Sequence, residues 1–211
     1  MVEIILVRHG ETDWNAAGVF RGRADIGLNQ TGVQQADLLG KSLSVVKIDA
    51  VYASPLQRAL KTAEAIAGYQ ALEVMVTPGL IDFDFGEWQG LSHHEVKGRY
   101  QELYTDWINH PDRVKIPGGE SLESVSKRAM VVVSGIIGQY GEGRVVLVSH
   151  RVVNKVLICA LLGLDNSHFW NIRLDTCGIT SFSYEEGRFI LTRHNDTSHL
   201  KNVHIALPAD F

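Results

Sequence analysis

The chain has 211 residues, of which 45% are hydrophobic and 21% charged, and its formal net charge is −4. This composition is typical of a globular protein with one sizeable core, and it excludes a disordered chain and a nucleic-acid binder that works through bulk positive charge. The longest apolar stretches are too short to span a bilayer, and no secretory-type segment precedes the first strand. Cys159 and Cys177 lie far apart without a CxxC pattern, which favours reduced thiols in a cytoplasmic protein.

Predicted strands and helices alternate along most of the chain. The predicted strands are short apolar or β-branched runs, at about 3–7, 50–54, 73–77 and 144–149. The predicted helices have apolar residues at a period near 3.6, and they cover about 31–45, 55–66, 93–108, 121–140 and 152–162. Near the C-terminus, two β-rich runs on either side of Glu185-Glu186-Gly187 predict a hairpin, at 178–184 and 189–194.

This alternation predicts an α/β protein with three layers, α/β/α, around a mostly parallel sheet. The C-terminal hairpin adds an antiparallel edge. No internal repeat, linker or break in composition divides the chain, so we expect a single domain over 1–211. Residues from about 91 to 119 carry few strand signals, which predicts a helical insertion that covers the site.

The string RHGET at 8–12 directly follows the apolar run at 4–7, with Asn15 three residues further on. In open α/β sheets, ligands bind at the carboxyl ends of the strands. A histidine held there beside a guanidinium is well placed to attack a phosphoryl group. Arg58, in the string ASPLQRA, and His150 also follow predicted strands, so we expect both at the same edge.

Four strings together resemble the histidine phosphatase superfamily, also called phosphoglycerate mutase-like. RHGET with Asn15 resembles its signature, ASPLQRA at 53–59 its SSPLxRA motif, and Ser149-His150 its second catalytic histidine. LIDFDFGEWQG at 80–90 resembles the LxExxFGxWEG stretch that carries the general acid. NDTSHL at 195–200 also resembles the small phosphatases of the family.

The resemblance implies a phosphomonoesterase that acts on a small phosphorylated metabolite, without a metal or another cofactor. His9 would be the nucleophile and Asp82 the general acid. Arg8, Arg58 and His150 would bind the phosphoryl oxygens.

Asn15, Arg21 and Gly22 are candidate substrate-binding residues. Asn15 can donate a neutral hydrogen bond from the loop, and 21–22 occupies the family's substrate-contacting loop. Arg21 departs from the family, in which glutamine often precedes the glycine. It either grips a substrate anion or faces solvent.

Asp82 is the largest departure, because the family has glutamate at this position. Aspartate is one methylene shorter, so its carboxyl stops about 1.5 Å short unless the backbone moves. Asp84 is the rival acid, because alternate residues of an extended stretch share a side. We favour Asp82 for its motif position.

Two other functions remain open beside the phosphatase. Cofactor-dependent phosphoglycerate mutases share the machinery, but they typically carry ERHYG after the acid position and a longer insertion, where this chain has FGEWQG. A non-catalytic phosphate-binding module is the third candidate. Such a module would be expected to lack at least one of four residues, but all four are intact: Arg8, His9, Arg58 and His150. The substrate and the oligomeric state, including a homodimer, are left open by the sequence.

Weaker candidates complete the sequence predictions. His93-His94 favours a solvated or lid-located pair over a metal site, because no further ligands accompany it. Residues 118–121 form either a loop near the substrate or the turn that starts a helix. His199 is a candidate for the mouth of the pocket. Phe169, Trp170 and Trp107 are expected to serve in packing.

Overall fold

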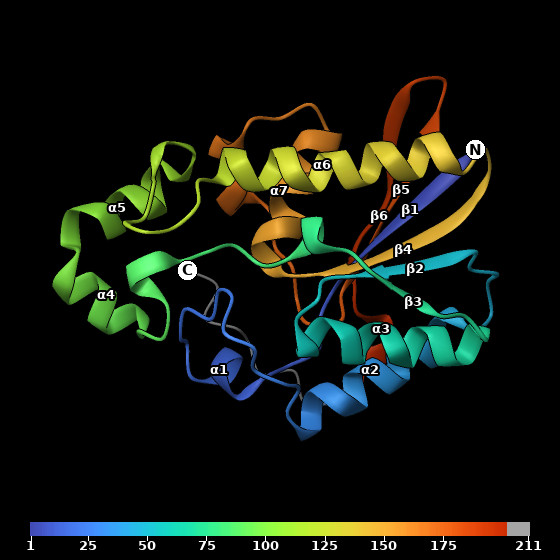
Figure 1. The fold of residues 1–211 in the computed structure, drawn as a ribbon, viewed down its shortest axis with the longest axis horizontal. Coiled ribbons are helices and arrows are strands. Elements are labelled where there is room, and N and C mark those ends of the chain that lie inside the picture. Colours follow the sequence, from blue (N-terminus) through green and yellow to red (C-terminus); the bar gives the residue numbers. More distant parts are fainter. Residues whose placement is uncertain (202–211) are drawn as a thin grey trace.

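The computed structural model describes residues 1–201, in which six strands form one sheet in the order β3-β2-β4-β1-β5-β6 (Figure 1). The strands are β1 (Val2–Arg8), β2 (Ala50–Ala53), β3 (Val74–Val76), β4 (Gly143–Ser149), β5 (Ile179–Glu185) and β6 (Arg188–Asp196). The first four are parallel, while β5 runs antiparallel to β1 and to β6. The predicted α/β fold, with its mostly parallel sheet and antiparallel edge, is confirmed.

Helices cover both faces of this sheet (Figure 1). One face carries α2 (Gln30–Leu43) and α3 (Gln57–Gln70), and the other carries α6 (Leu122–Gln139) and α7 (Arg151–Leu161). Beyond the carboxyl ends of the parallel strands lie three shorter helices, α1 (Asp13–Ala16), α4 (His93–Arg99) and α5 (Gln101–Asn109). Five 3₁₀ turns complete the order, η1 (Pro78–Leu80), η2 (Gly86–Trp88), η3 (Pro111–Arg113), η4 (Asn166–Asn171) and η5 (Ser198–Leu200).

Alternate residues of the central strands enter two separate cores. In β1, Ile4 and Leu6 pack with α6 and α7, whereas Ile5 and Val7 pack with α2 and α3. A strand covered on both faces needs no polar side, which explains why β1 and β4 read as continuous apolar runs. Each fully buried aliphatic side chain of this kind contributes about 1.5–3 kcal/mol. The two cores hold the central strands rigidly, and thereby also the loops at their carboxyl ends.

The helix predicted over 93–108 is instead two helices, because the chain breaks at Tyr100. This residue has φ −130° and ψ 45°, outside the helical region, and it ends α4 and begins α5. The break brings the rings of Tyr100 and Tyr104 each to 6.2 Å from that of the buried Trp88. Packing around this tryptophan therefore overrides a continuous helical period.

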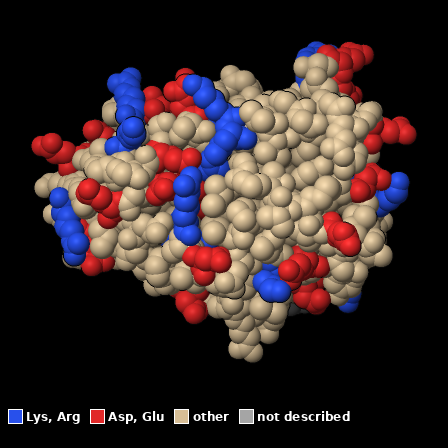
Figure 2. All heavy atoms as spheres, viewed as in Figure 1, with Lys and Arg blue, Asp and Glu red and all other residues tan. Residues whose placement is uncertain are grey.

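Charged side chains of both signs are mixed on one face of the molecule. On the face shown in Figure 2, Lys and Arg side chains are interspersed with Asp and Glu. Within residues 1–201, no helix is both long and apolar enough to cross a membrane.

Candidate active site

The loop after β1 is held by close backbone packing. The His9 amide donates to the Ser149 carbonyl at 3.0 Å, which continues the β1–β4 pairing past the strand. The Gly10 amide donates to the Thr62 hydroxyl at 3.0 Å. A Cβ at Gly10 would come within 2.6 Å of the Gly32 carbonyl oxygen at the start of α2, so a side chain cannot be accommodated here without a backbone shift. The glycine therefore fixes where the preceding histidine lies.

His9 is fully buried, and its ring is held in one orientation by its neighbour. Nδ1 lies 2.7 Å from the Gly10 carbonyl oxygen, which can only accept, so Nδ1 carries the proton. Nε2 is then left with its lone pair, and it has no hydrogen-bond partner among the described residues. Burial, followed by the charge of Arg58, holds the pKa of His9 well below its ordinary value. The imidazole is therefore neutral near pH 7, as a nucleophile requires.

Two buried arginines flank this ring. Arg8 donates from Nη1 to the Leu174 carbonyl. Arg58 donates from Nη1 to the Ala24 carbonyl at 2.8 Å and from Nη2 to the Gly22 carbonyl, also at 2.8 Å. Backbone oxygens thus orient both guanidiniums.

Gly22 has φ +52°, in the left-handed region that favours glycine, and its backbone turns the carbonyl toward Arg58. The sequence predicted that Gly22 contacts the substrate. In the structure, its carbonyl oxygen orients the Arg58 guanidinium.

His150 completes the cluster from the end of β4. Its ring centroid lies 5.2 Å from that of His9, and its Nε2 lies 2.7 Å from the Ser54 hydroxyl oxygen. Burial, followed by the charge of Arg58, lowers the pKa of His150 well below its ordinary value. It therefore enters the site as a neutral ring, able to hydrogen-bond a phosphoryl oxygen.

The two candidate acids diverge. Asp82 is buried, and its Oδ2 lies 2.9 Å from Arg58 Nη2 and 3.5 Å from His150 Nδ1. Asp84 is partly exposed and turns the other way, with Oδ2 3.3 Å from Arg23 Nη1. The stretch is not extended in the way that would put both carboxylates on one side, so Asp82 alone joins the cluster.

The position of Asp82 depends on Arg128 of α6, which the sequence predictions missed. Its guanidinium donates to three backbone carbonyls of the loop, those of Gly79 at 2.8 Å, Ile81 at 2.6 Å and Asp82 at 3.1 Å. Glu120 holds the same guanidinium at 3.0 Å. These contacts hold the loop backbone close to the cluster, which lets a carboxyl one methylene short reach Arg58.

Comparison with known proteins agrees with this geometry. The chain matches the model of the histidine phosphatase superfamily (branch 1) over residues 4–197. The chain belongs to that family. It is 38% identical over 205 residues to phosphoserine phosphatase 1 of Hydrogenobacter thermophilus, covering 97% of both chains.

Two further similar proteins are named for a phosphatase activity and for a mutase activity. The crystal structure of phosphoserine phosphatase from Entamoeba histolytica in complex with 3-phosphoglyceric acid has a TM-score of 0.86 and 34% identity, covering 95% of this chain and 100% of that chain. Probable phosphoglycerate mutase GpmB of Erwinia tasmaniensis is 28% identical, over 96% of this chain and 97% of its own. The family and its phosphatases support a phosphoric monoester hydrolase.

A pocket opens beside the cluster of this histidine phosphatase. Its lining includes five polar side chains, Arg8, Asn15, Arg21, His93 and Arg151. Arg8, Asn15 and Arg21 were predicted at the site, and Asn15 Oδ1 is held by the Thr12 amide at 3.0 Å. Arg151 was missed, although it directly follows His150 at the start of α7.

The two histidines of the His93-His94 pair differ. His93 is partly buried at the pocket, where its ring centroid lies 4.2 Å from that of Phe20. Burial, with the charges of Arg151 and Arg21, lowers the pKa of His93 to about 4. His94 is exposed. Within residues 1–201, no three His, Cys, Asp or Glu side chains gather as metal ligands.

The remaining candidates lie outside the pocket lining. Glu120 pairs with Arg128, and Ser121 caps α6, so the loop at 118–121 serves both the acid loop and the helix start. His199 lies in η5, which contacts α2. Trp107 and Phe169 are fully buried, as packing residues are expected to be.

Proposed function

We propose that this histidine phosphatase hydrolyses small phosphomonoesters through a phosphohistidine on His9, and that it needs no metal. The state of His9 carries the proposal. Nδ1 is committed to the Gly10 carbonyl, and the buried, neutral Nε2 faces a cluster with two guanidiniums. These are the parts that phosphoryl transfer requires, a positioned nucleophile and donors for the equatorial oxygens.

In the proposed first step, His9 Nε2 attacks phosphorus and the bond to the ester oxygen breaks. Asp82 donates its proton to that oxygen, so the alcohol leaves neutral. In the second step, water attacks the phosphohistidine and transfers a proton to Asp82. The bond between phosphorus and nitrogen breaks, which releases phosphate and restores both residues.

The cluster supplies binding energy for the phosphoryl group. Arg8 and Arg58 present forked donors, His150 adds a ring donor, and Asn15 donates an amide hydrogen from α1. All these groups except Asn15 are buried, so their charges and dipoles act in a water-poor site, where they are worth more than in bulk solvent.

We further propose a cytoplasmic location, which the free, buried thiols of Cys159 and Cys177 support. Phosphoglycerate mutase is the second candidate. The family includes such enzymes, and the machinery is shared up to the phosphohistidine. Hydrolysis is favoured because the chain has FGEWQG after the acid position in place of the mutase string.

The test is a panel of phosphorylated metabolites that includes phosphoserine, 3-phosphoglycerate, sugar phosphates and α-ribazole phosphate. We expect phosphate release from at least one of them, unchanged in EDTA. We also expect release from 3-phosphoglycerate to be faster than its conversion to 2-phosphoglycerate. Interconversion that outpaces hydrolysis and depends on 2,3-bisphosphoglycerate would reassign the protein as a mutase, and complete loss in EDTA would remove the metal-free mechanism.

A further inference from the structure

The pocket is lined by arginines that the phosphate cluster does not include. Arg21 and Arg151 both line it, together with Arg8. Arg21 comes from the loop after α1, and Arg151 is the first residue of α7, with its guanidinium carbon 6.0 Å from the Trp170 ring centroid. Two guanidiniums from separate parts of the chain therefore converge beside the phosphate cluster.

No acidic side chain lines this pocket among the described residues. The buried carboxylate of Asp82 is outside this lining and is already 2.9 Å from Arg58. Nε of Arg21 is buried and has no hydrogen-bond partner within residues 1–201. A buried donor of this kind is costly unless a ligand satisfies it.

The electrostatics of the pocket point the same way. Burial lowers the pKa of Arg21 well below its ordinary value, and the charges of Arg8 and Arg151 lower it further. Groups whose pKa is perturbed by burial and by specific neighbouring charges are candidates for functional sites. His93 does not add a third cation, because its pKa of about 4 leaves the ring neutral near pH 7.

We propose that Arg21 and Arg151 form a carboxylate subsite, so that the substrate is a phosphorylated hydroxy or amino acid. Its carboxylate lies a few bonds from the phosphorus. This inference rests on the proposed function, since the phosphoryl group is taken to occupy the cluster around His9. Arg8 lies between the two subsites, because it belongs to the cluster and also lines the pocket.

The walls of the pocket favour a carboxylate over a second phosphoryl group. Val19, Phe20 and Phe85 line it beside the guanidiniums, which suits a short carbon skeleton. A planar carboxylate matches a guanidinium fork with two oxygens, whereas a second phosphoryl dianion is bulkier and requires more donors.

The experiment compares substrates that differ only in the carboxylate. Phosphoserine is paired with phosphoethanolamine, and 3-phosphoglycerate with glycerol 3-phosphate. We expect kcat/KM to be roughly 10–150-fold higher for the carboxylate of each pair, the range for a charged hydrogen bond. Equal values within both pairs would overturn the subsite, and so would faster hydrolysis of a bisphosphate such as fructose 1,6-bisphosphate than of either acid.

Variants locate the effect. Arg21→Gln and Arg151→Gln should each lower kcat/KM for the carboxylate substrates by about tenfold or more, and by a clearly smaller factor for p-nitrophenyl phosphate, which has no carboxylate. The matched control is Arg99→Gln, an exposed arginine of α4 that pairs with Glu95. It should change neither. Survival of the carboxylate preference in both pocket variants, with melting temperatures like the wild type, would overturn the assignment.

A binding measurement separates this inference from the proposed function. Calorimetry on His9→Ala should show tighter binding of phosphoserine than of phosphoethanolamine, and Arg21→Gln in that background should remove the difference. If the wild type hydrolyses no phosphate ester, the proposed function fails while calorimetry still decides the subsite. If it hydrolyses p-nitrophenyl phosphate but calorimetry shows no difference, the subsite fails alone.

Discussion

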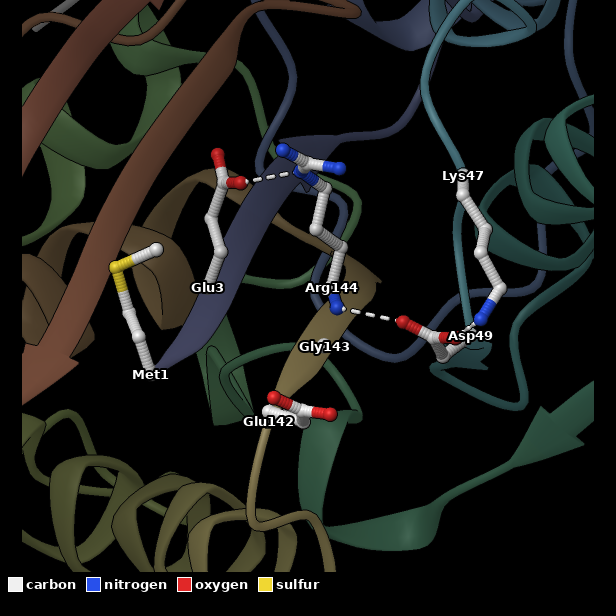
Figure 3. A pocket seen from close by; sticks show the side chains of 7 residues that line it. All are labelled: Met1, Glu3, Lys47, Asp49, Glu142, Gly143 and Arg144. Carbon is white, nitrogen blue, oxygen red and sulfur yellow. Dashed lines mark hydrogen bonds and ion pairs between the residues drawn. The ribbon is translucent and has the colours of Figure 1, made fainter.

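The amino and carboxyl ends of the parallel strands, here called the amino edge and the carboxyl edge, differ in how their charges are paired. β1 and β4 run in parallel, from the pair Val2–Gly143 at the amino edge to the pair Arg8–Ser149 at the carboxyl edge. The same two strands therefore contribute to both edges. The amino edge holds a hollow of about 480 Å³, far larger than the pocket beside His9 (Figure 3). This hollow is lined by Met1, Glu3, Lys47, Asp49, Glu142, Gly143 and Arg144.

At the amino edge, each cation has a carboxylate of its own. Arg144 Nε lies 2.6 Å from Glu3 Oε2, and Lys47 Nζ lies 2.7 Å from Asp49 Oδ1 (Figure 3). At the carboxyl edge, the buried Asp82 carboxylate lies 2.9 Å from Arg58, and the lining of the neighbouring pocket holds Arg8, Arg21 and Arg151 but no acidic side chain of residues 1–201. The comparison teaches that a gathering of guanidiniums marks the site better than volume does, because groups perturbed by burial and by neighbouring charge cluster at functional sites.

The largest expected effect is the loss of the nucleophile. His9→Ala should abolish both phosphate release and the acid-labile phosphoenzyme, lowering kcat by roughly 10⁴-fold or more, as for other catalytic nucleophiles. A rapidly quenched reaction of the wild type with a good substrate should trap phosphate on His9, identified by peptide mapping. Phosphate trapped on a serine or aspartate, or near-normal turnover in the variant, would eliminate the assignment.

The next effect separates Asp82 from Asp84. Asp82→Asn should slow alkyl phosphates by about a hundredfold or more, because their leaving groups need a proton. p-Nitrophenyl phosphate should lose far less, since its leaving group is a stable anion. The matched control is Asp84→Asn, whose carboxylate contacts Arg23 outside the cluster, and its effect should be mild.

The reverse pattern in these two variants would move the acid role to Asp84. An equal loss on both substrates from Asp82→Asn would mean that this residue binds or supports the fold rather than donating a proton. Steady-state kcat and KM on each substrate decide between the outcomes.

The sequence predicted the elements of this site that follow strands. Arg8, His9 and His150 come at the ends of apolar runs, and parallel strands bring their carboxyl ends together. The strand order alone therefore brings these three residues together in the structure. The same local argument found Arg58, which lies in the first turn of α3.

The parts that the sequence did not predict depend on contacts between distant segments. Arg128 looks like any polar residue of an amphipathic helix, and only the fold brings it to the backbone of 79–82. Arg151 carries a local signal, its place directly after His150, but a single arginine at a helix start usually faces solvent. The break at Tyr100 depends on packing around Trp88, which the spacing of apolar residues in the sequence does not reveal.

A smaller effect concerns stability against pH. The folded pKa values of His9 and His150 are lowered, whereas in the unfolded chain histidine titrates near 6.5. Below that pH the unfolded chain binds more protons than the fold, so stability is complete above about pH 6.5 and falls on acidification. Each buried histidine should contribute a loss of up to about 1.4 kcal/mol per pH unit.

Urea unfolding at pH 7.5, 6.5, 5.5 and 5.0 measures this slope. His9→Asn should make the slope shallower, because one buried, neutral imidazole is removed. His94→Ala is the control for the loss of a histidine at an exposed position. Identical slopes in His9→Asn and the wild type would contradict the lowered pKa of His9.

The smallest effect is expected at the amino edge. Arg144→Met removes the ion pair with Glu3 while leaving the hydrogen bond from the residue 144 amide to Asp49, 2.9 Å in the wild type. Because both side chains are partly exposed, at 42% and 25%, solvent screens the pair, and its loss should cost about 1 kcal/mol or less. A double-mutant cycle with Glu3→Gln in urea isolates the pair from the packing of each side chain.

The kcat/KM of Arg144→Met for the best substrate should stay within about twofold of the wild type, because surface changes away from a site are usually near neutral. A tenfold loss of kcat/KM, with the free energy of unfolding unchanged, would show that the hollow in Figure 3 takes part in the reaction, and that the contrast between the two edges does not locate the site.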